Sequence, residues 1–130
     1  MEEDKKRNIH YEFGKFAENI AAEYYIKNGY AILERNWRLN KIEIDIIAQK
    51  DNIVAFVEVK ARNGKDQDPV DAVNNEKKRR MAKGADAYLK SFKGYYEYRF
   101  DIFALTGDFQ DYKIEILEDA FLAPLSSKYL

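Results

Sequence analysis

One run of nine residues constrains the fold of this chain more than any other segment. Residues 53–61 read IVAFVEVKA, so apolar side chains occupy both odd and even positions until Glu58 and Lys60 interrupt them. Successive side chains of a strand point to opposite faces of its sheet. A run that is apolar on both faces therefore predicts a central strand, and the same alternation places Glu58 and Lys60 on one face at its end.

The neighbouring segments predict further strands. Residues 42–46 alternate isoleucine with acidic residues, the pattern of a half-buried strand, and the turn signal Asp51-Asn52 joins this strand to the central one as a hairpin. Residues 30–36 predict a short strand before the hairpin. Two later strands are predicted at residues 96–104 and 112–116, where apolar and polar side chains alternate again.

Two helices complete the predicted order of elements. Between Phe13 and Tyr24 apolar residues recur at every third or fourth position, which predicts an amphipathic helix that ends near Asn28-Gly29. Asp68-Pro69 predicts the start of a second helix, because an aspartate N-cap followed by proline favours the first helical turn. Its apolar stripe comprises Val70, Val73, Met81, Ala85, Tyr88, Leu89 and Phe92. The predicted order is helix, three strands, helix, two strands, an α/β fold.

Composition limits the kinds of site that the chain can carry. Its 130 residues fit one domain over residues 1–130, with a core from about residue 12 to 122 and a flexible or peripheral start at residues 1–10. The absence of cysteine excludes disulfides and thiolate nucleophiles, and the single His10 excludes a histidine metal cluster, so any metal must be bound by oxygen. No apolar run approaches the ~20 residues of a membrane span, and we expect a cytoplasmic protein with no membrane partner.

The acidic residues on the predicted hairpin form the strongest candidate site. Asp45 lies on the first strand of the hairpin and Glu58-x-Lys60 ends the second, so the two carboxylates can converge with the ammonium about 7 Å further along the strand. Carboxylates between apolar neighbours repel each other and resist desolvation unless a cation compensates them. The pattern favours a divalent-cation site, although Glu-x-Lys is also the pattern of an ordinary solvated ion pair on a strand.

A divalent cation held by these carboxylates favours phosphodiester hydrolysis. The metal would lower the pKa of an attacking water and stabilise the charge that develops on the phosphate oxygens. Lys60 would orient the nucleophile or neutralise the transition state, because an ammonium is a poor base unless its pKa is depressed. The net charge of -1 gives no general attraction to a polyanion, so local basic clusters must supply any contact with nucleic acid.

These motifs resemble the PD-(D/E)xK nuclease superfamily, with its restriction-endonuclease-like fold. More narrowly, the chain resembles the YraN-type family of small endonuclease-like proteins related to archaeal Holliday-junction resolvases. The resemblance covers about residues 12 to 122 and rests on Gly14-x-x-x-Glu18, Gly29-Tyr30, Arg35-Asn36, Glu43-Ile44-Asp45, Phe56-Val57-Glu58-Val59-Lys60-x-Arg62, Lys77, Arg99-Phe100-Asp101 and Ala120-Phe121. One departure is Ile42, where the family usually has glycine.

The resemblance implies a fold, a ligand set and a substrate. The fold would be an αβββαβ(β) core with a mixed central sheet flanked by helices. Glu18 would join Asp45 and Glu58 as ligands of Mg²⁺ or Mn²⁺, with Lys60 as the fourth catalytic residue. The activity would be that of a metal-dependent endonuclease on branched or structured DNA. By analogy with resolvases the chain would act as a homodimer, because paired cuts across a junction need two symmetry-related sites.

Several basic residues are candidates for DNA contacts. Arg62 and Lys77 would grip phosphates beside the cut, and Arg99 is a further candidate. Two of them have an ordinary alternative: Lys77 lies in the basic run Lys77–Arg80, which is typical of a solvated helix face, and Arg99 could form a surface ion pair with Asp101. At the level of function, a nuclease-like module that binds nucleic acid or protein without cutting is the main alternative, and an α/β scaffold with an accidental acidic cluster is another.

Overall fold

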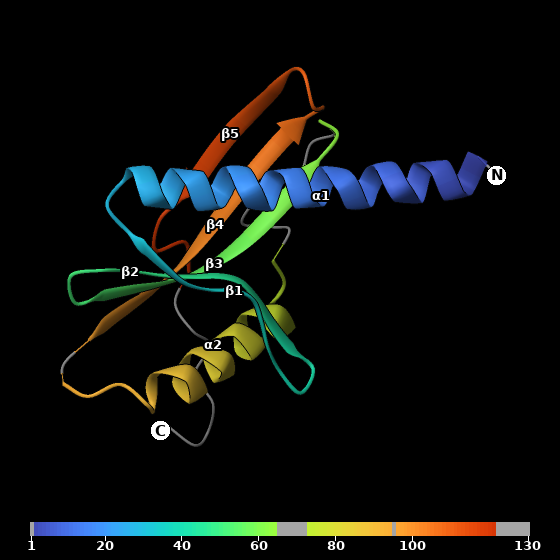
Figure 1. Ribbon diagram of the computed structural model, residues 1–130. Helices are drawn as coiled ribbons and strands as arrows, with labels where there is room; N and C mark the ends of the chain where they lie inside the picture. Colours follow the sequence, from blue (N-terminus) through green and yellow to red (C-terminus); the bar gives the residue numbers. More distant parts are fainter. Residues whose placement is uncertain (1, 65–72, 95, 122–130) are drawn as a thin grey trace.

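The computed structural model describes residues 2–64, 73–94 and 96–121 (Figure 1). Its elements follow the predicted order of helix, three strands, helix and two strands. They are α1 (Glu2–Lys27), β1 (Ala31–Leu39), β2 (Ile42–Lys50), β3 (Ile53–Arg62), α2 (Asn75–Leu89), β4 (Glu97–Gly107) and β5 (Tyr112–Leu117). The predicted α/β class and the αβββαβ(β) order are confirmed.

The five strands form one mixed sheet in the order β1-β2-β3-β4-β5. β3 pairs parallel to β4, and the other neighbouring pairs are antiparallel. The parallel pair needs a long crossover connection, which contains α2. The run at residues 53–61 is therefore the central strand, as its two apolar faces predict, and Asp51-Asn52 is the hairpin turn before it.

The two helices cover opposite faces of the sheet (Figure 1). On one face α1 packs Ala21, Ala22 and Tyr25 against side chains such as Val57 and Phe103. On the other face, the apolar stripe of α2 packs against the sheet and forms a second cluster. Its buried members are Ile44, Ile47, Val54, Phe56, Val73, Met81, Ala85, Phe100, Ile102 and Phe121. The result is a three-layer arrangement in which the central strand is buried on both sides. No helix in the described part of the chain is long and apolar enough to cross a membrane.

Both helix starts differ from the sequence prediction. α1 begins at Glu2, eleven positions before the predicted start at Phe13, and its first turns extend past the edge of the sheet (Figure 1). Those turns are exposed, so no apolar periodicity marked them in the sequence. α2 begins at Asn75, and the side chain of Asn74 caps it by accepting a hydrogen bond of 2.9 Å from the Lys77 N–H. The predicted cap at Asp68 lies outside the described residues.

A glycine inside α2 lets this helix lie close to β2. A Cβ atom added to Gly84 would stand 2.9 Å from Ile42 Cγ2 and 2.9 Å from Ile44 Cδ1, and 3.3 Å from a ring carbon of Trp37. The lack of a side chain at Gly84 is thus what accommodates Ile42, the residue that departs from the family pattern. Ile42 and Ile44 flank Glu43 and bring α2 up to the strand that carries Asp45.

Candidate active site

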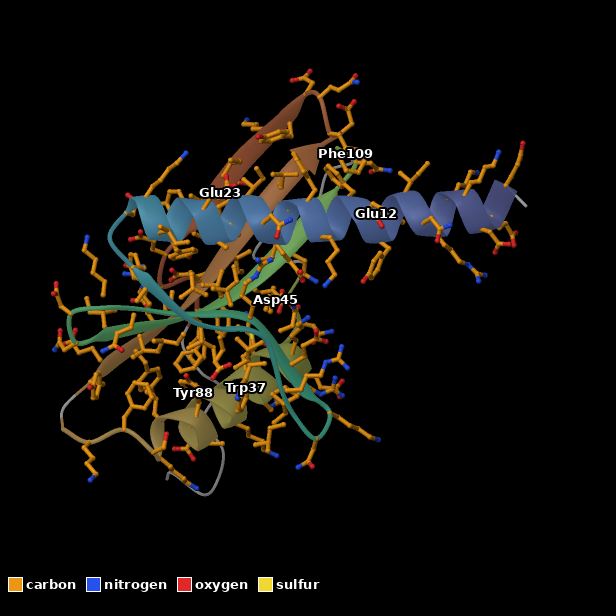
Figure 2. The ribbon with its side chains drawn as sticks, viewed as in Figure 1. Glu12, Glu23, Trp37, Asp45, Tyr88 and Phe109 are labelled. Carbon is orange, nitrogen blue, oxygen red and sulfur yellow. The ribbon has the colours of Figure 1, made fainter. Side chains whose placement is uncertain are left out.

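The site begins where β2 separates from β3. The two strands pair from Lys50↔Ile53 as far as Ile46↔Val57, and the pairing stops at Asp45. There the Asp45 carboxylate takes the place of a backbone partner, because its Oδ2 accepts a hydrogen bond of 2.8 Å from the Val59 N–H. Ile44 packs beneath α2 whereas Ile46 packs beneath α1, so the regular alternation predicted for residues 42–46 is broken at Asp45. Asp45 consequently lies between the two helices (Figure 2).

Glu58 brings two lysines to the same point. Its side chain is only 4% exposed, and its Oε1 lies 2.8 Å from Lys77 Nζ and 3.9 Å from Lys60 Nζ. Lys60 comes from β3 itself, two residues along the strand, and Lys77 comes from the first turn of α2 on the facing layer. The structure thus joins Asp45, Glu58 and Lys60 as the sequence predicts, and it adds Lys77 as the closest cation to Glu58.

The electrostatics of the site show how poorly its charges are compensated. Burial raises the pKa of Asp45 to about 8, and the neighbouring Glu58 carboxylate adds to this effect, while the Val59 N–H and Lys77 oppose it. Burial also disfavours the Lys77 ammonium, yet the Glu58 carboxylate outweighs that cost and raises the pKa of Lys77 above its ordinary value. Lys77 therefore pairs with Glu58, while Asp45 keeps its proton near neutral pH.

Glu18 approaches the pair from α1. It is close enough to contribute to the raised pKa of Asp45, and its Oε2 is buried without a hydrogen-bond partner, with Lys15 Nζ 3.5 Å away. The Lys15 ammonium partly compensates this oxygen, which accepts no hydrogen bond within the described residues. Within the described residues, however, no group of three or more acidic or histidine side chains is arranged to hold a metal ion as it stands.

The donor set fits a hard divalent cation in its chemistry. Asp45, Glu58 and Glu18 offer only carboxylate oxygens, the ligands that Mg²⁺ prefers, and Mg²⁺ is commonly held by one or two protein carboxylates. Asp45 and Glu58 would supply those two, and Glu18 would reach the ion directly or through water. Lys77 would then share Glu58 with the ion.

Arg99 is engaged in a separate buried network on β4. Its guanidinium donates to the Asp101 carboxylate at 2.9 Å and to the Tyr30 hydroxyl at 2.6 Å. Asp101 is fully buried and also accepts from the Tyr25 hydroxyl at 2.7 Å and from the Asp119 N–H at 3.0 Å. The Arg99–Asp101 pair predicted from the sequence exists, but it is buried and ties α1 to β4 rather than lying on the surface.

Two further polar residues lie on the strands that carry the site. Arg62 ends β3 on the same face as Glu58 and Lys60, by the alternation of the strand. Glu43 is half-exposed and lies 3.4 Å from Arg38, so its carboxylate has a partner on the neighbouring strand β1. The contact of Lys77 with Glu58 was missed in the sequence, where the run Lys77–Arg80 gave no sign of which lysine turns inward. The helix cap at Asn74 is the signal that could have identified it, since it fixes where the first turn begins.

Comparison with known proteins places the chain in a family. A family model described as "Uncharacterised protein family UPF0102" matches residues 17–105, a range that contains Glu18, Asp45, Glu58 and Lys77. A UPF0102 protein of Phocaeicola vulgatus is 44% identical over 117 residues, which cover 89% of this chain and 97% of the relative. Another, from Flavobacterium psychrophilum, is 45% identical over 113 residues, covering 86% and 95% of the two chains.

A more distant relative shows the same extent of similarity. A UPF0102 protein of Clostridium botulinum is 37% identical over 121 residues, which cover 87% of this chain and 98% of the relative. The matches thus run over nearly the full length of both chains and include every element that builds the candidate site. The chain belongs to the uncharacterised protein family UPF0102, the YraN-type family that its motifs resemble.

Proposed function

We propose that this protein is a metal-dependent endonuclease that hydrolyses phosphodiester bonds in branched or structured DNA. The observation that carries the proposal is the buried acidic pair of Asp45 and Glu58 at the point where β2 leaves β3, with two lysines beside it. Acidic groups buried together reduce stability. A fold that keeps them at one point is best explained by a cation that they bind.

The pKa of Asp45 supports this explanation. Without a cation the carboxyl group keeps its proton up to about pH 8, because burial and Glu58 disfavour the ionised form. A divalent cation favours the deprotonated ligand, so its binding would release that proton near neutral pH. We propose Mg²⁺ or Mn²⁺, because every donor in the site is a carboxylate oxygen.

The residues of the chain then have distinct roles in hydrolysis. Bound at this site, the metal ion would lower the pKa of the attacking water and stabilise charge on the phosphate oxygens. Lys60, whose side chain is 27% exposed, can reach a phosphate at the mouth of the site and stabilise the charge that develops in the transition state. Lys77 holds the Glu58 carboxylate in place through its contact of 2.8 Å.

Lys77 also favours a second candidate function. Its ammonium already neutralises Glu58, so the pair is partly compensated by the chain itself. A nuclease-like module that binds nucleic acid without cutting would need no more than this. The two candidates differ in whether a divalent cation changes the protein, which makes metal binding the first quantity to measure.

The first experiment measures thermal unfolding with EDTA, with Mg²⁺ and with Mn²⁺. If the site binds the cation, the ion stabilises the wild type, by about 2.7 kcal/mol when its concentration is a hundred times Kd. Asp45→Ala should abolish this shift. Glu43→Ala is the matched control, because Glu43 lies on the same strand and its carboxylate is half-exposed beside Arg38. A wild type that neither ion stabilises would contradict the proposal.

The second experiment measures cleavage of fork, flap, four-way junction and linear DNA. We expect metal-dependent cutting of the branched forms, reduced at least a hundredfold by Lys60→Ala, in keeping with the loss of one group that stabilises transition-state charge. Lys83→Ala is the control, since Lys83 is exposed on α2. Binding to these DNAs without cutting in either metal would favour the second candidate. Cleavage that survives Lys60→Ala would assign the activity to another site.

The substrate class and assembly remain part of the proposal. Resemblance to junction resolvases supports a branched substrate, and two cuts placed symmetrically across a junction require two copies of the site. We therefore propose that the active form on a junction is a homodimer. The molar mass of the protein alone and bound to a junction, measured by light scattering, tests this assembly directly.

A further inference from the structure

A hollow separate from the acidic pair lies beside the projecting half of α1. Its volume is about 480 Å³, within the range of roughly 300–1,000 Å³ that is usual for small-ligand sites. Three parts of the chain line it: the exposed turns of α1, the end of β3 and the connection between β4 and β5. The residues that matter below are Lys6, Ile9, His10, Phe13, Asn63 and Phe109.

An aromatic wall is the main feature of the hollow. Phe109 is 44% exposed although it is a large apolar side chain, and Ile9, which also lines the hollow, is 60% exposed. The Phe109 ring packs against two other rings, because its centroid lies 5.3 Å from that of Phe13 and 5.3 Å from that of Phe16. An exposed ring fixed in this way offers a flat surface on which a planar group can stack.

Polar groups stand around this apolar wall. Lys6 and His10 come from α1, and the Asn63 amide, which can both donate and accept hydrogen bonds, comes from the end of β3. Asp108 also lines the hollow, but its Oδ1 accepts from the backbone N–H groups of Gln110 at 2.9 Å and Asp111 at 2.8 Å. Those two donors lower the pKa of Asp108 and occupy its carboxylate within the turn.

The hollow is connected to the candidate active site through β3. Asn63 follows Lys60 by three positions, and at about 3.3 Å per residue of strand the two lie about 10 Å apart along the chain. The Lys60 side chain lies on the α2 face of β3 and the hollow lies on the α1 face, so a DNA strand would reach both by passing the end of β3 beyond Arg62. This placement favours a part of the same strand as the occupant over a separate small molecule.

We propose that the hollow binds one unpaired nucleotide of the DNA strand that occupies the active site. The inference rests on the proposed function, and it specifies which feature of a branched substrate is recognised. The base stacks on Phe109, the Asn63 amide bonds to its polar edge, and Lys6 contacts the adjoining phosphate. A paired base cannot enter, because both its faces are covered by its neighbours in the duplex, so the hollow selects DNA with unpaired positions.

The test compares two DNAs in the presence of EDTA, so that binding is measured without cleavage. Fluorescence anisotropy gives Kd for a forked duplex with two unpaired arms and for a fully paired duplex of the same number of base pairs. We expect the wild type to bind the fork at least fivefold more tightly. Phe109→Ala should reduce this preference to below twofold, whereas Phe109→Trp, which keeps an aromatic face, should retain it.

Two further variants separate stacking from general damage. Asn63→Ala removes only the exposed amide and should lower the preference for the fork without changing Tm. Tyr98→Ala is the matched control, since Tyr98 is an aromatic residue that is 54% exposed on β4 and does not line the hollow. It should leave the preference unchanged. An equal loss in Tyr98→Ala would overturn the assignment to the hollow.

The outcomes also distinguish this inference from the proposed function. A wild type that cuts branched DNA but binds fork and duplex equally overturns the inference and leaves the endonuclease proposal intact. A wild type that prefers the fork but cuts nothing in Mg²⁺ or Mn²⁺ supports the inference and contradicts the endonuclease proposal. If Phe109→Ala keeps the fork preference and instead changes the molar mass in solution, the hollow is a protein interface and the inference is wrong.

Discussion

Asp45 shows how a single hydrogen bond can position a costly residue. Its carboxyl group accepts from the Val59 N–H at the point where the β2–β3 ladder ends, so the backbone donor is satisfied by a side chain instead of a strand. That bond lowers the pKa of Asp45, yet burial and Glu58 together raise it to about 8. The position is therefore fixed by the backbone, while burial and Glu58 keep the ionised form unfavourable.

This balance predicts how stability depends on pH. The unfolded chain releases the Asp45 proton near pH 4, whereas the folded chain keeps it up to about pH 8. Between these values the folded state holds one more proton, so the free energy of unfolding falls as pH rises and levels off above pH 8. Asp45→Asn keeps an acceptor for Val59 and removes this loss, so it should exceed the wild type in stability by about 2 kcal/mol or more at pH 8.

Urea unfolding at pH 5, 6.5 and 8 in EDTA measures the difference. The gap in the free energy of unfolding between Asp45→Asn and wild type should widen steadily over that series, because the wild type loses stability as Asp45 deprotonates and the variant has no proton to lose at that position. Glu43→Gln serves as the control, and its gap should stay nearly constant. A gap for Asp45→Asn that is the same at all three values would refute the raised pKa.

At this scale the sequence predicted which acidic residues would come together but not all of their contacts. Asp45 and Glu58 stood out because acidic residues within apolar strands are rare, and alternation placed Glu58 and Lys60 on one face, whereas the break in alternation at Asp45 was not predictable. Lys77 was placed among phosphate-binding candidates, whereas its ammonium lies on Glu58. Periodicity alone could not decide this, since four basic residues cover a whole helical turn and the start of α2 depends on the cap at Asn74.

At the scale of elements, the contact between α2 and β2 determines how closely the two sides of the site approach. Gly84 allows the approach, because a Cβ there would stand 2.9 Å from both Ile42 and Ile44. Glycine in a helix costs about 1 kcal/mol relative to alanine. That cost accompanies the close approach of α2 to β2.

Gly84→Ala should therefore destabilise the protein although alanine favours helix. Overpacking in a core costs about 1–3 kcal/mol, which exceeds the gain in helix propensity, so we expect a net loss of about 1 kcal/mol. Gly14→Ala is a matched control, because Gly14 is also helical and a Cβ there meets nothing within 4 Å. The free energy of unfolding of Gly14→Ala should rise by up to about 1 kcal/mol. Opposite signs in the two thermal unfolding curves are the expected result, and a gain in both would show that α2 can move away from β2 freely.

The strands could be predicted from the sequence more fully than the start of α1 or the contacts of Arg99. Strand positions were predictable because the β3 run is apolar on both faces and its neighbours alternate. The first turns of α1 were not, because residues 2–12 are exposed and carry no apolar stripe. The role of Arg99 was also hidden, since only the folded sheet brings Tyr25 and Tyr30 to Asp101 and Arg99.

At the scale of the whole molecule, the net charge of -1 limits how strongly DNA can be attracted. Lys77 and Arg99 form ion pairs with Glu58 and Asp101, so we do not include these two residues among the expected phosphate contacts. Each phosphate neutralised by a duplex-binding protein contributes about 0.9 to the slope of log K against log salt. We expect a slope of about -2 to -3 for the fork, far shallower than for strongly basic DNA-binding proteins.

Anisotropy titrations between about 50 and 200 mM salt test this expectation. Lys6→Gln should reduce the slope by about one, because Lys6 is assigned a phosphate contact. Lys83→Gln should leave it unchanged. A wild-type slope of about -6 or steeper would mean that the lysines and arginines assigned to internal ion pairs bind phosphates after all.

The length of α1 has a geometric consequence for the two sites. The helix is unbroken from Glu2 to Lys27, and it carries His10 at the hollow and Glu18 beside the acidic pair. Eight helical residues span about 12 Å, and a strand of B-form DNA rises about 3.4 Å per nucleotide. Under the two proposals above, this spacing would place the cut roughly three or four nucleotides from the unpaired base, and inserting one helical turn between His10 and Glu18 should move the cut outward by one or two nucleotides.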